Sequence, residues 1–357
     1  MDETNYDLVV VGGGIIGAAT AFAVARSGFS VALVDPAPGM GSSFAAAGML
    51  APGAESTPEH VALTERSHIA LSKWPEFAAH IGAVSATRVD FQRAGSLFVA
   101  WSDGDRRELA RYFAVAATQR IQATSVARVD EPSLFSGVNP RVNDGTLVES
   151  DAFVDAELTL SALLDAARSL GTVFAPYRVV ECHETSGGVE VRTTAGTLRG
   201  RCGIVATGYQ DSPLELLTRS ARKLRPVRGV TLRLHLDDVV ASPMVRAQID
   251  GRAVYIIRRP DGTVVVGATS DETSRDIVEA SAVRRLLDDA TMILPELDEA
   301  HFLHARVGLR PASSDHLPFF EELDDTGWAW SSGHYRHGFL LAPLAGDDAL
   351  EFVRRRC

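Results

Sequence analysis

The sequence contains few cysteines, and their spacing argues against two roles that cysteines often have. Only three occur in 357 residues, Cys182, Cys202 and Cys357, and no two of them form a CxxC pair or a zinc-binding spacing. We therefore expect neither a disulfide framework nor a structural zinc site. Idle thiols are typical of a reducing compartment, so the sequence predicts a cytoplasmic protein.

A surplus of positive charge is also lacking. The 35 lysine and arginine residues are outnumbered by 46 aspartate and glutamate residues, which leaves a formal net charge of −11. A general nucleic-acid binder needs clustered basic residues, so that class of protein is not expected. An acidic protein that binds an acidic small molecule must supply local cations, and isolated arginines become candidates for that task.

No stretch is typical of a membrane span or a signal peptide. The uncharged run between Asp7 and Arg26 is long enough to resemble a span, but three consecutive glycines interrupt it. Asp2 and Glu3 precede it, whereas a signal peptide begins with basic residues. We interpret this run as buried structure of a globular protein and expect no integral membrane segment.

The same run carries a glycine motif. A short apolar strand, LVVV at 8–11, leads into GGGIIG, in which Gly12, Gly14 and Gly17 stand in GxGxxG register. We expect Gly12 to form the tight turn and Gly14 to let a pyrophosphate approach the backbone. Gly17 then lets the following helix, 15–27, pack closely on the strand.

A second strand completes the pattern of a dinucleotide-binding fold. Residues 31–34 form another apolar run, which ends in Asp35, 18 positions beyond Gly17. This spacing places a carboxylate where it can accept hydrogen bonds from ribose hydroxyls. No second GxGxxG and no GxxxxGK occurs in the chain, so one dinucleotide is expected. The motif alone does not distinguish FAD from NAD.

Small residues follow in GSSFAAAGMLAP, at 41–52. Ser42 and Ser43 offer hydroxyls and backbone donors near the pyrophosphate. The small residues 45–48 allow a flat ring system to lie against the main chain. The alternative interpretation is the start of a small-residue helix.

Length and patterning predict two domains of an α/β protein, α+β overall. Apolar residues at helical spacing predict further helices at 57–80, 103–120, 151–170 and 276–293, and 57–80 forms either one helix or two. Strand patterns occupy 88–101, a hairpin across 189–208 that delivers Thr207 and Gly208 to the cofactor edge, and longer strands from about 222 onward. The predicted discontinuous Rossmann-like domain comprises 1–84, 150–221 and 322–357. The predicted sheet-rich substrate domain comprises 85–149 and 222–321.

Several segments together resemble one family: VVVGGGIIGAATAFAVARSG, AAAGMLAP, VYIIRR with GTVVVGAT, VGLRP and GHYRHGFLLAP. In the same order and over nearly the whole chain they are similar to the D-amino-acid oxidase superfamily of flavoproteins, and within it to the glycine oxidases of thiamine biosynthesis. The resemblance implies a noncovalently bound FAD. With the glycine motif and the 207–208 turn, the predicted cofactor-binding residues are Gly12, Gly14, Ile15, Ile16, Gly17, Asp35, Pro36, Ser42, Ser43, Ala47, Gly48, Met49, Val180, Thr207, Gly208, His334, Tyr335, His337, Gly338, Phe339 and Leu340.

The resemblance also implies a reaction. Arg310 in GLRP binds the substrate carboxylate as a bidentate fork, Arg336 assists and Tyr255 donates its hydroxyl. A small amine such as glycine, sarcosine or D-alanine then passes a hydride to FAD, and O2 reoxidises the cofactor to give hydrogen peroxide. The imine hydrolyses to a 2-oxo acid or enters thiazole synthesis. From the residues alone, an ordinary ion pair for each arginine and a core position for Tyr255 remain alternatives.

The C-terminal segment SGHYRHGFLLAP, 332–343, fits this picture. Its two glycines let the backbone pass close to the flavin, and a helix that begins near Phe339 aims its free N–H groups at the flavin edge that gains negative charge. The late histidines match no metal-ligand spacing, so no metal is expected. No cysteine follows Arg310 closely, so a covalent flavin is not expected either.

Three positions depart from the family pattern. Arg258 stands where proline is common, Ser270 replaces a larger apolar residue and His337 stands where asparagine is frequent. We expect these differences to widen or repolarise the substrate pocket, so the sequence predicts FAD more firmly than glycine.

Two other functions stay open at this point. One is a dehydrogenase of D-amino acids or secondary amines that passes electrons to an acceptor other than oxygen. The other is a non-catalytic flavin-binding subunit, although the intact set of Arg310, Arg336 and Tyr255 argues against it. The resemblance further implies a homo-oligomer.

Overall fold

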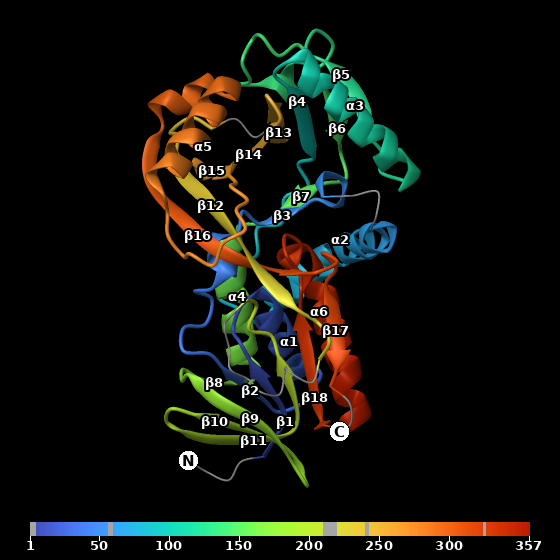
Figure 1. Ribbon diagram of the computed structural model, residues 1–357, viewed down its shortest axis with the longest axis vertical. Coiled ribbons are helices and arrows are strands. Elements are labelled where there is room, and N and C mark those ends of the chain that lie inside the picture. Colours follow the sequence, from blue (N-terminus) through green and yellow to red (C-terminus); the bar gives the residue numbers. More distant parts are fainter. Residues whose placement is uncertain (1–4, 56–59, 210–219, 240–242, 324–325) are drawn as a thin grey trace.

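The computed structural model describes residues 5–55, 60–209, 220–239, 243–323 and 326–357. Two eight-stranded sheets form its framework, one in the lower half and one in the upper half of Figure 1. We name them the lower sheet and the upper sheet. A short two-stranded sheet, β3 (Met49–Leu50) with β7 (Ala152–Phe153), accompanies them.

The lower sheet has a parallel core around the first strand. Its order is β17-β18-β11-β1-β2-β8, and a hairpin of β9 and β10 extends from β11. The strand β1 pairs in parallel with both β2 and β11, which matches the continuous apolar runs expected of strands covered on both faces. The bounds are β1 Asn5–Val11, β2 Val31–Val34, β8 Val173–Ala175, β9 Val179–Thr185, β10 Gly188–Thr193, β11 Gly196–Val205, β17 Phe319–Glu322 and β18 Trp328–Ser332.

Four helices pack around this sheet and against one another (Figure 1). They are α1 (Ile15–Arg26), α2 (Val61–Gly82), α4 (Ala156–Ser169) and α6 (Gly338–Arg356). Nearly every residue of α1 is buried, because α6 and α4 pack on it as well as the sheet. The first and the last helix of the described chain are therefore neighbours.

The upper sheet is mostly antiparallel and has the order β16-β12-β15-β14-β13-β4-β6-β5. Two helices, α3 (Asp103–Thr118) and α5 (Ala280–Ile293), pack beside it. The bounds of its strands are β4 Ser96–Ala100, β5 Thr124–Ala127, β6 Asp144–Val148, β12 Leu224–His235, β13 Met244–Ile249, β14 Arg252–Arg258, β15 Thr263–Gly267 and β16 His301–Ser313.

Side-chain alternation gives the upper sheet two different faces. Ile256 and Val266 belong to the apolar core that includes α5. Their neighbours Tyr255, Ile257 and Val265 point the other way, into a smaller cluster with Phe98. This second face is the one that carries functional side chains.

Every predicted helix is present, but three begin later than predicted. The helix predicted at 151–170 begins at Ala156, because Asp155 caps it by accepting hydrogen bonds from Glu157 N and Leu158 N, while residues 152–153 form β7. The helix predicted at 276–293 begins at Ala280, and the one predicted at 57–80 begins at Val61, with 56–59 outside the described residues. Within the described ranges, no helix combines the length and apolar character that a bilayer crossing requires.

Candidate active site

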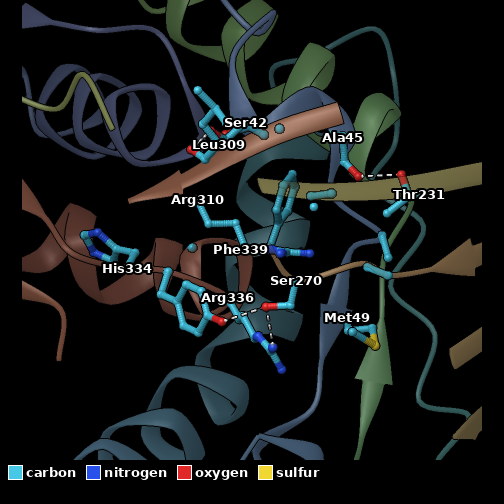
Figure 2. A pocket seen from close by; sticks show the side chains of 18 of the residues that line it. Ser42, Ala45, Met49, Thr231, Ser270, Leu309, Arg310, His334, Arg336 and Phe339 are labelled. Atoms are coloured by element: carbon cyan, nitrogen blue, oxygen red, sulfur yellow. Dashed lines mark hydrogen bonds between the residues drawn. The ribbon is translucent and has the colours of Figure 1, made fainter. Parts of the chain in front are cut away.

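A cavity of about 980 Å³ runs between the glycine motif of the lower sheet and the second face of the upper sheet. Segments from both ends of the chain line it (Figure 2). It brings together twenty of the residues predicted to bind cofactor or substrate: Gly12, Gly14, Ile15, Ile16, Asp35, Pro36, Ser42, Ser43, Ala47, Gly48, Met49, Thr207, Gly208, Tyr255, Arg310, His334, Tyr335, Arg336, Gly338 and Phe339.

Four predicted residues do not line the cavity. Gly17 lies behind it, where an added Cβ would come within 1.8 Å of Gly12 O, so its contribution is the close packing of helix on strand. His337 is the buried N-cap residue of α6, and Leu340 is buried in the next turn, where its carbonyl accepts a hydrogen bond from Trp74 Nε1 at 3.0 Å. Val180 is the extra residue of a β-bulge, since β9 pairs Glu181 with Arg192 but Val179 with Thr193, and Val180 is 45% exposed.

The N-terminal end of the cavity is preorganised by side chains that bind backbone amides. Asp35 accepts from Gly13 N and from Ala37 N, both at 2.7 Å and each on a different oxygen. Its carboxylate therefore keeps lone pairs for further hydroxyl donors. Ser43 Oγ accepts from Ile15 N at 3.0 Å and so ties the small-residue segment to the first turn of α1.

The upper sheet holds residues 42–46 in place from the opposite side. Thr231 donates to Ala45 O at 2.9 Å, and the Ser42 hydroxyl donates to Leu309 O, as Figure 2 shows. The buried Arg233 donates to Ala46 O at 2.7 Å. The segment is therefore fixed between both sheets rather than forming the longer helix that was the alternative; only 42–45 make a 3-10 turn.

The C-terminal segment lies against the strand that carries Arg310. Tyr335 N donates to Pro311 O at 3.0 Å, and this bond brings the loop with Arg336 beside β16. The helix α6 begins at Gly338, whose position for a Cβ is 3.4 Å from Ile15 Cγ2. The N-termini of α1 and α6 thus open on the same cavity, which favours negative charge there. Burial lowers the pKa of His334 to about 3, so its imidazole is neutral.

Two glycines leave room for the predicted substrate-binding side chains. A Cβ on Gly229 would lie 2.1 Å from Arg310 Nη2, and a Cβ on Gly267 would lie 2.3 Å from the Tyr255 hydroxyl. The guanidinium of Arg310 donates to Thr269 O at 3.2 Å. Burial lowers the pKa of Arg310 and raises that of Tyr255, but guanidinium groups stay protonated in proteins.

Arg336 lies across the cavity from Arg310. Its Nη2 contacts Ser270 Oγ at 3.4 Å, and Ser270 Oγ also lies 3.4 Å from the Tyr335 hydroxyl (Figure 2). Its Nη1 is 3.5 Å from a carboxylate oxygen of Glu55. The Arg336 side chain is 40% exposed, so it stands at the open side of the site.

Among the charged residues of the cavity that were absent from the sequence prediction, Glu55 and Arg246 lie beside the predicted substrate-binding side chains. Glu55 bridges two arginines, since its other carboxylate oxygen lies 3.2 Å from Arg246 Nη1. Burial alone would raise the pKa of Glu55, but Arg246 and Arg336 lower it to about 2. Arg246 had a signal in the sequence: Asp250-Gly251 is a hairpin turn, and counting outward from it pairs Arg246 with Tyr255, as observed.

Of the three residues that depart from the family pattern, only Ser270 lines the cavity, where it was expected. Arg258 does not: it lies on the other face of β14, where it pairs with Glu296 at 3.1 Å and donates to Ser136 O at 2.7 Å. The expectation that Arg258 alters the substrate pocket was wrong, because strand alternation turns its side chain away. His337 is buried at the start of α6 outside the cavity lining, but it helps to lower the pKa of Glu55, which lines the cavity.

Comparison with known proteins agrees with this geometry. The model of the FAD dependent oxidoreductase (DAO) family matches residues 7–351, so the chain belongs to that family and is an FAD-dependent enzyme of the amino-acid oxidase class. It is 26% identical to a glycine oxidase of Bacillus licheniformis, over 98% of this chain and 93% of that one. It is 30% identical, over 96% and 95%, to a Rhizobium etli protein assigned to thiamine biosynthesis as the oxidoreductase ThiO. The crystal structure of glycine oxidase from Geobacillus kaustophilus superposes with a TM-score of 0.89 at 26% identity, over 99% of this chain and 95% of that one.

The residues present fit FAD, the cofactor of this family. The glycine turn at 12–14, the free lone pairs of Asp35 and the two helix N-termini suit the ribose and pyrophosphate of a dinucleotide. The small residues 45–48 and the start of α6 both line the cavity. None of the three cysteines lines the cavity, and the noncovalent attachment of the cofactor stays a prediction.

Proposed function

We propose that this enzyme oxidises small amino acids to imines, which hydrolyse to 2-oxo acids, and that O2 accepts the electrons to give hydrogen peroxide. Glycine, sarcosine and D-alanine are the first candidates. The observation that carries this proposal is the environment of Arg310. Its guanidinium faces the cavity and donates to main-chain carbonyls, and no carboxylate in the described part of the chain forms an ion pair with it. A substrate carboxylate supplies the missing charged partner.

Three side chains would bind and orient the substrate. Arg310 receives the carboxylate, and the Tyr255 hydroxyl lies on the same wall of the cavity. Arg336 stands at the open side, where its guanidinium would contact a bound anion. A substrate held by its carboxylate between these groups retains few orientations, and this positioning is the main contribution of the protein to the rate. The FAD supplies the acceptor for two electrons.

No side chain among those described at this end of the cavity is suited to take the substrate's amine proton. Glu55 has a pKa of about 2 and is shared by two arginines, so it is a weak base. Tyr255 has a raised pKa and stays neutral. We infer that the amine loses its proton to solvent before it reacts, so kcat/KM should rise with pH as the free substrate amine deprotonates.

The relatives support both the substrate class and a pathway. One of them is named a glycine oxidase, and the Rhizobium etli relative is assigned to thiamine biosynthesis. We therefore propose that the imine product, or the 2-oxo acid formed from it, serves the thiazole branch of thiamine synthesis. We also propose the domain division predicted from the sequence, with a cofactor-binding domain of 1–84, 150–221 and 322–357 and a substrate domain of 85–149 and 222–321.

An anaerobic titration of the yellow holoenzyme tests the proposal. Glycine, sarcosine or D-alanine should bleach the flavin absorbance. When air is admitted, the absorbance should recover as fast as the enzyme turns over, and hydrogen peroxide should form. Arg310→Met should bind FAD normally but bleach far more slowly at equal substrate concentration. A protein that contains no flavin, or a flavin that none of these amines bleaches, contradicts the proposal. Fast bleaching followed by slow recovery in air would show that the enzyme oxidises amines but passes the electrons to an acceptor other than oxygen.

A further inference from the structure

Arg246 is a third arginine of the cavity with no role in the proposed reaction. It lies in β13 directly opposite Tyr255 of β14, so the two side chains project from the same face of the upper sheet. Its side chain is only 15% exposed. The guanidinium carbon lies 5.6 Å from the centre of the Phe98 ring, and Nη1 is 3.6 Å from Met49 Sδ. Arg246 is therefore held by packing and points into the site.

The charged side chains that line the cavity around Arg246 do not balance. One carboxylate, that of Glu55, is shared between Arg246 and Arg336, and Arg310 has only carbonyl partners. The lining of this end of the cavity thus carries three cations and one anion. Behind the lining, the buried Asp151 also interacts with Arg246, and burial raises the pKa of its carboxyl to about 6. While Asp151 is protonated, a substrate with a single carboxylate reduces the surplus from two positive charges to one.

The remaining charged residues of the cavity do not remove this surplus. Arg252 is paired with Asp289 at 2.7 Å. Three others, Glu108, Asp276 and Arg285, are exposed to solvent and stand farther out. Asp35 is at the opposite, dinucleotide end, where it binds backbone amides. The uncompensated charge therefore stays among Arg246, Arg310 and Arg336.

There is also space beside Arg246 for a substituent. Ala253 lies two residues from Tyr255 on the same face of β14, and Ser270 lines the cavity in contact with Arg336; both are small. The cavity continues past them to Leu109 and Tyr112 of α3. Glycine would leave this part of the site empty.

We propose that Arg246 binds a second carboxylate of the substrate, so that the preferred substrates are small amino acids with two carboxylates rather than glycine. This inference rests on the proposed function. The second carboxylate is attached either to the amine nitrogen, as in iminodiacetate, or to the side chain, as in D-aspartate. In both cases the Cα–H leaves as a hydride to FAD, the nitrogen loses a proton to solvent, and water hydrolyses the resulting imine. Iminodiacetate thus gives glyoxylate and glycine, and D-aspartate gives oxaloacetate and ammonia.

Steady-state and anaerobic kinetics of the holoenzyme test this assignment with two matched pairs of substrates. The pairs are iminodiacetate with sarcosine, and D-aspartate with D-alanine. In the wild type, kcat/KM should be at least tenfold higher for the dicarboxylate of one pair, and that pair identifies where the second carboxylate is attached. Arg246→Met should lower this ratio at least tenfold, mainly because kcat/KM for the dicarboxylate falls while kcat/KM for the monocarboxylate changes little. Arg246→Lys should keep part of the preference, because it retains the charge but not the fork.

A control variant and a binding measurement separate direct contact from general electrostatics. Arg285→Met removes the same charge from the rim of the cavity and should leave the ratio within about twofold. Malonate, which cannot be oxidised, should perturb the flavin spectrum of the wild type at a lower concentration than acetate, and Arg246→Met should abolish that difference. If Arg246→Met does not bind FAD, the kinetics of Arg246→Lys and the malonate and acetate titrations of the wild type and Arg246→Lys are used instead.

The outcomes distinguish this inference from the proposed function. If glycine, sarcosine or D-alanine bleaches the flavin while the dicarboxylates do so no better, or if Arg246→Met slows both members of a pair equally, Arg246 does not bind substrate but the enzyme is still an amine oxidase. If no amine of either kind bleaches the flavin, the proposed function itself fails.

Discussion

Replacing Gly229 by alanine tests the role of Arg310 without changing Arg310 itself. The new Cβ would lie 2.1 Å from Nη2 and 2.3 Å from Cζ, whereas ordinary contact begins near 3.4 Å. The guanidinium must therefore retreat by roughly 1.3 Å. It is the far end of a flexible side chain, so the strand keeps its backbone and only the position of the charge changes. Because a misplacement of about 1 Å costs on the order of 100-fold in rate, we expect kcat/KM to fall about 10- to 100-fold, or about 1.4–2.7 kcal/mol.

The assay is anaerobic stopped-flow reduction of the flavin over a range of substrate concentrations. Gly229→Ala should show weaker substrate binding while the visible spectrum and the melting temperature of the holoenzyme remain those of the wild type. Gly82→Ala is the matched control, since a Cβ there meets no atom within 4 Å and lies at the end of α2. A Gly229→Ala enzyme with wild-type kcat/KM and a full complement of FAD would refute the assignment of Arg310 as the carboxylate-binding residue.

Three further changes probe other parts of the site. Arg310→Ala should lose about 2–5 kcal/mol of transition-state stabilisation, measured as kcat/KM, and an unchanged value contradicts the carboxylate contact. Gly14→Val should give colourless protein, because its side chain occupies the pyrophosphate path beside Ser43, whose Oγ is 3.2 Å from an added Cβ; a yellow, saturated variant speaks against this. Asp151→Asn should stabilise the fold near pH 8. Burial raises the pKa of Asp151 to about 6 from 3.8, so the folded state binds the extra proton between those values and its stability declines as pH rises through them. The gain should be about 1–3 kcal/mol near pH 8 and vanish near pH 4, and equal melting temperatures of variant and wild type near pH 8 exclude it.

The cofactor half of the site was predictable because its chemistry is local. The glycine turn, the strand end with Asp35 and the pair Ser42-Ser43 each depend on neighbours close in sequence. Gly12, Gly14, Asp35, Ser42 and Ser43 all line the cavity. Motif resemblance added Arg310 and Arg336 from the far end of the chain. Arg310 and Arg336 line the same cavity because a backbone hydrogen bond, from Tyr335 N to Pro311 O, joins the loop before α6 to β16.

The parts that the sequence did not predict depend on pairings between distant residues. Glu55 follows no pattern, and its partners Arg246 and Arg336 lie in other elements far along the chain. Val180 was predicted from resemblance alone, and it is the extra residue of a bulge in β9, which no propensity reveals. The homo-oligomer, the compartment and the domain boundaries stay predictions.

The contact between the starts of α1 and α6 has a consequence for biosynthesis. Ile15 and Gly338 form one corner of the cofactor cavity, although the ribosome makes them more than 300 residues apart. The strand β1 likewise pairs with β11, and β11 pairs with β18, so the lower sheet is complete only after these later strands have been synthesised. A nascent chain can therefore collapse early but cannot close the pocket until α6 has emerged. Cofactor capture should therefore follow the synthesis of α6, and cells short of riboflavin should accumulate a compact, protease-sensitive apoprotein.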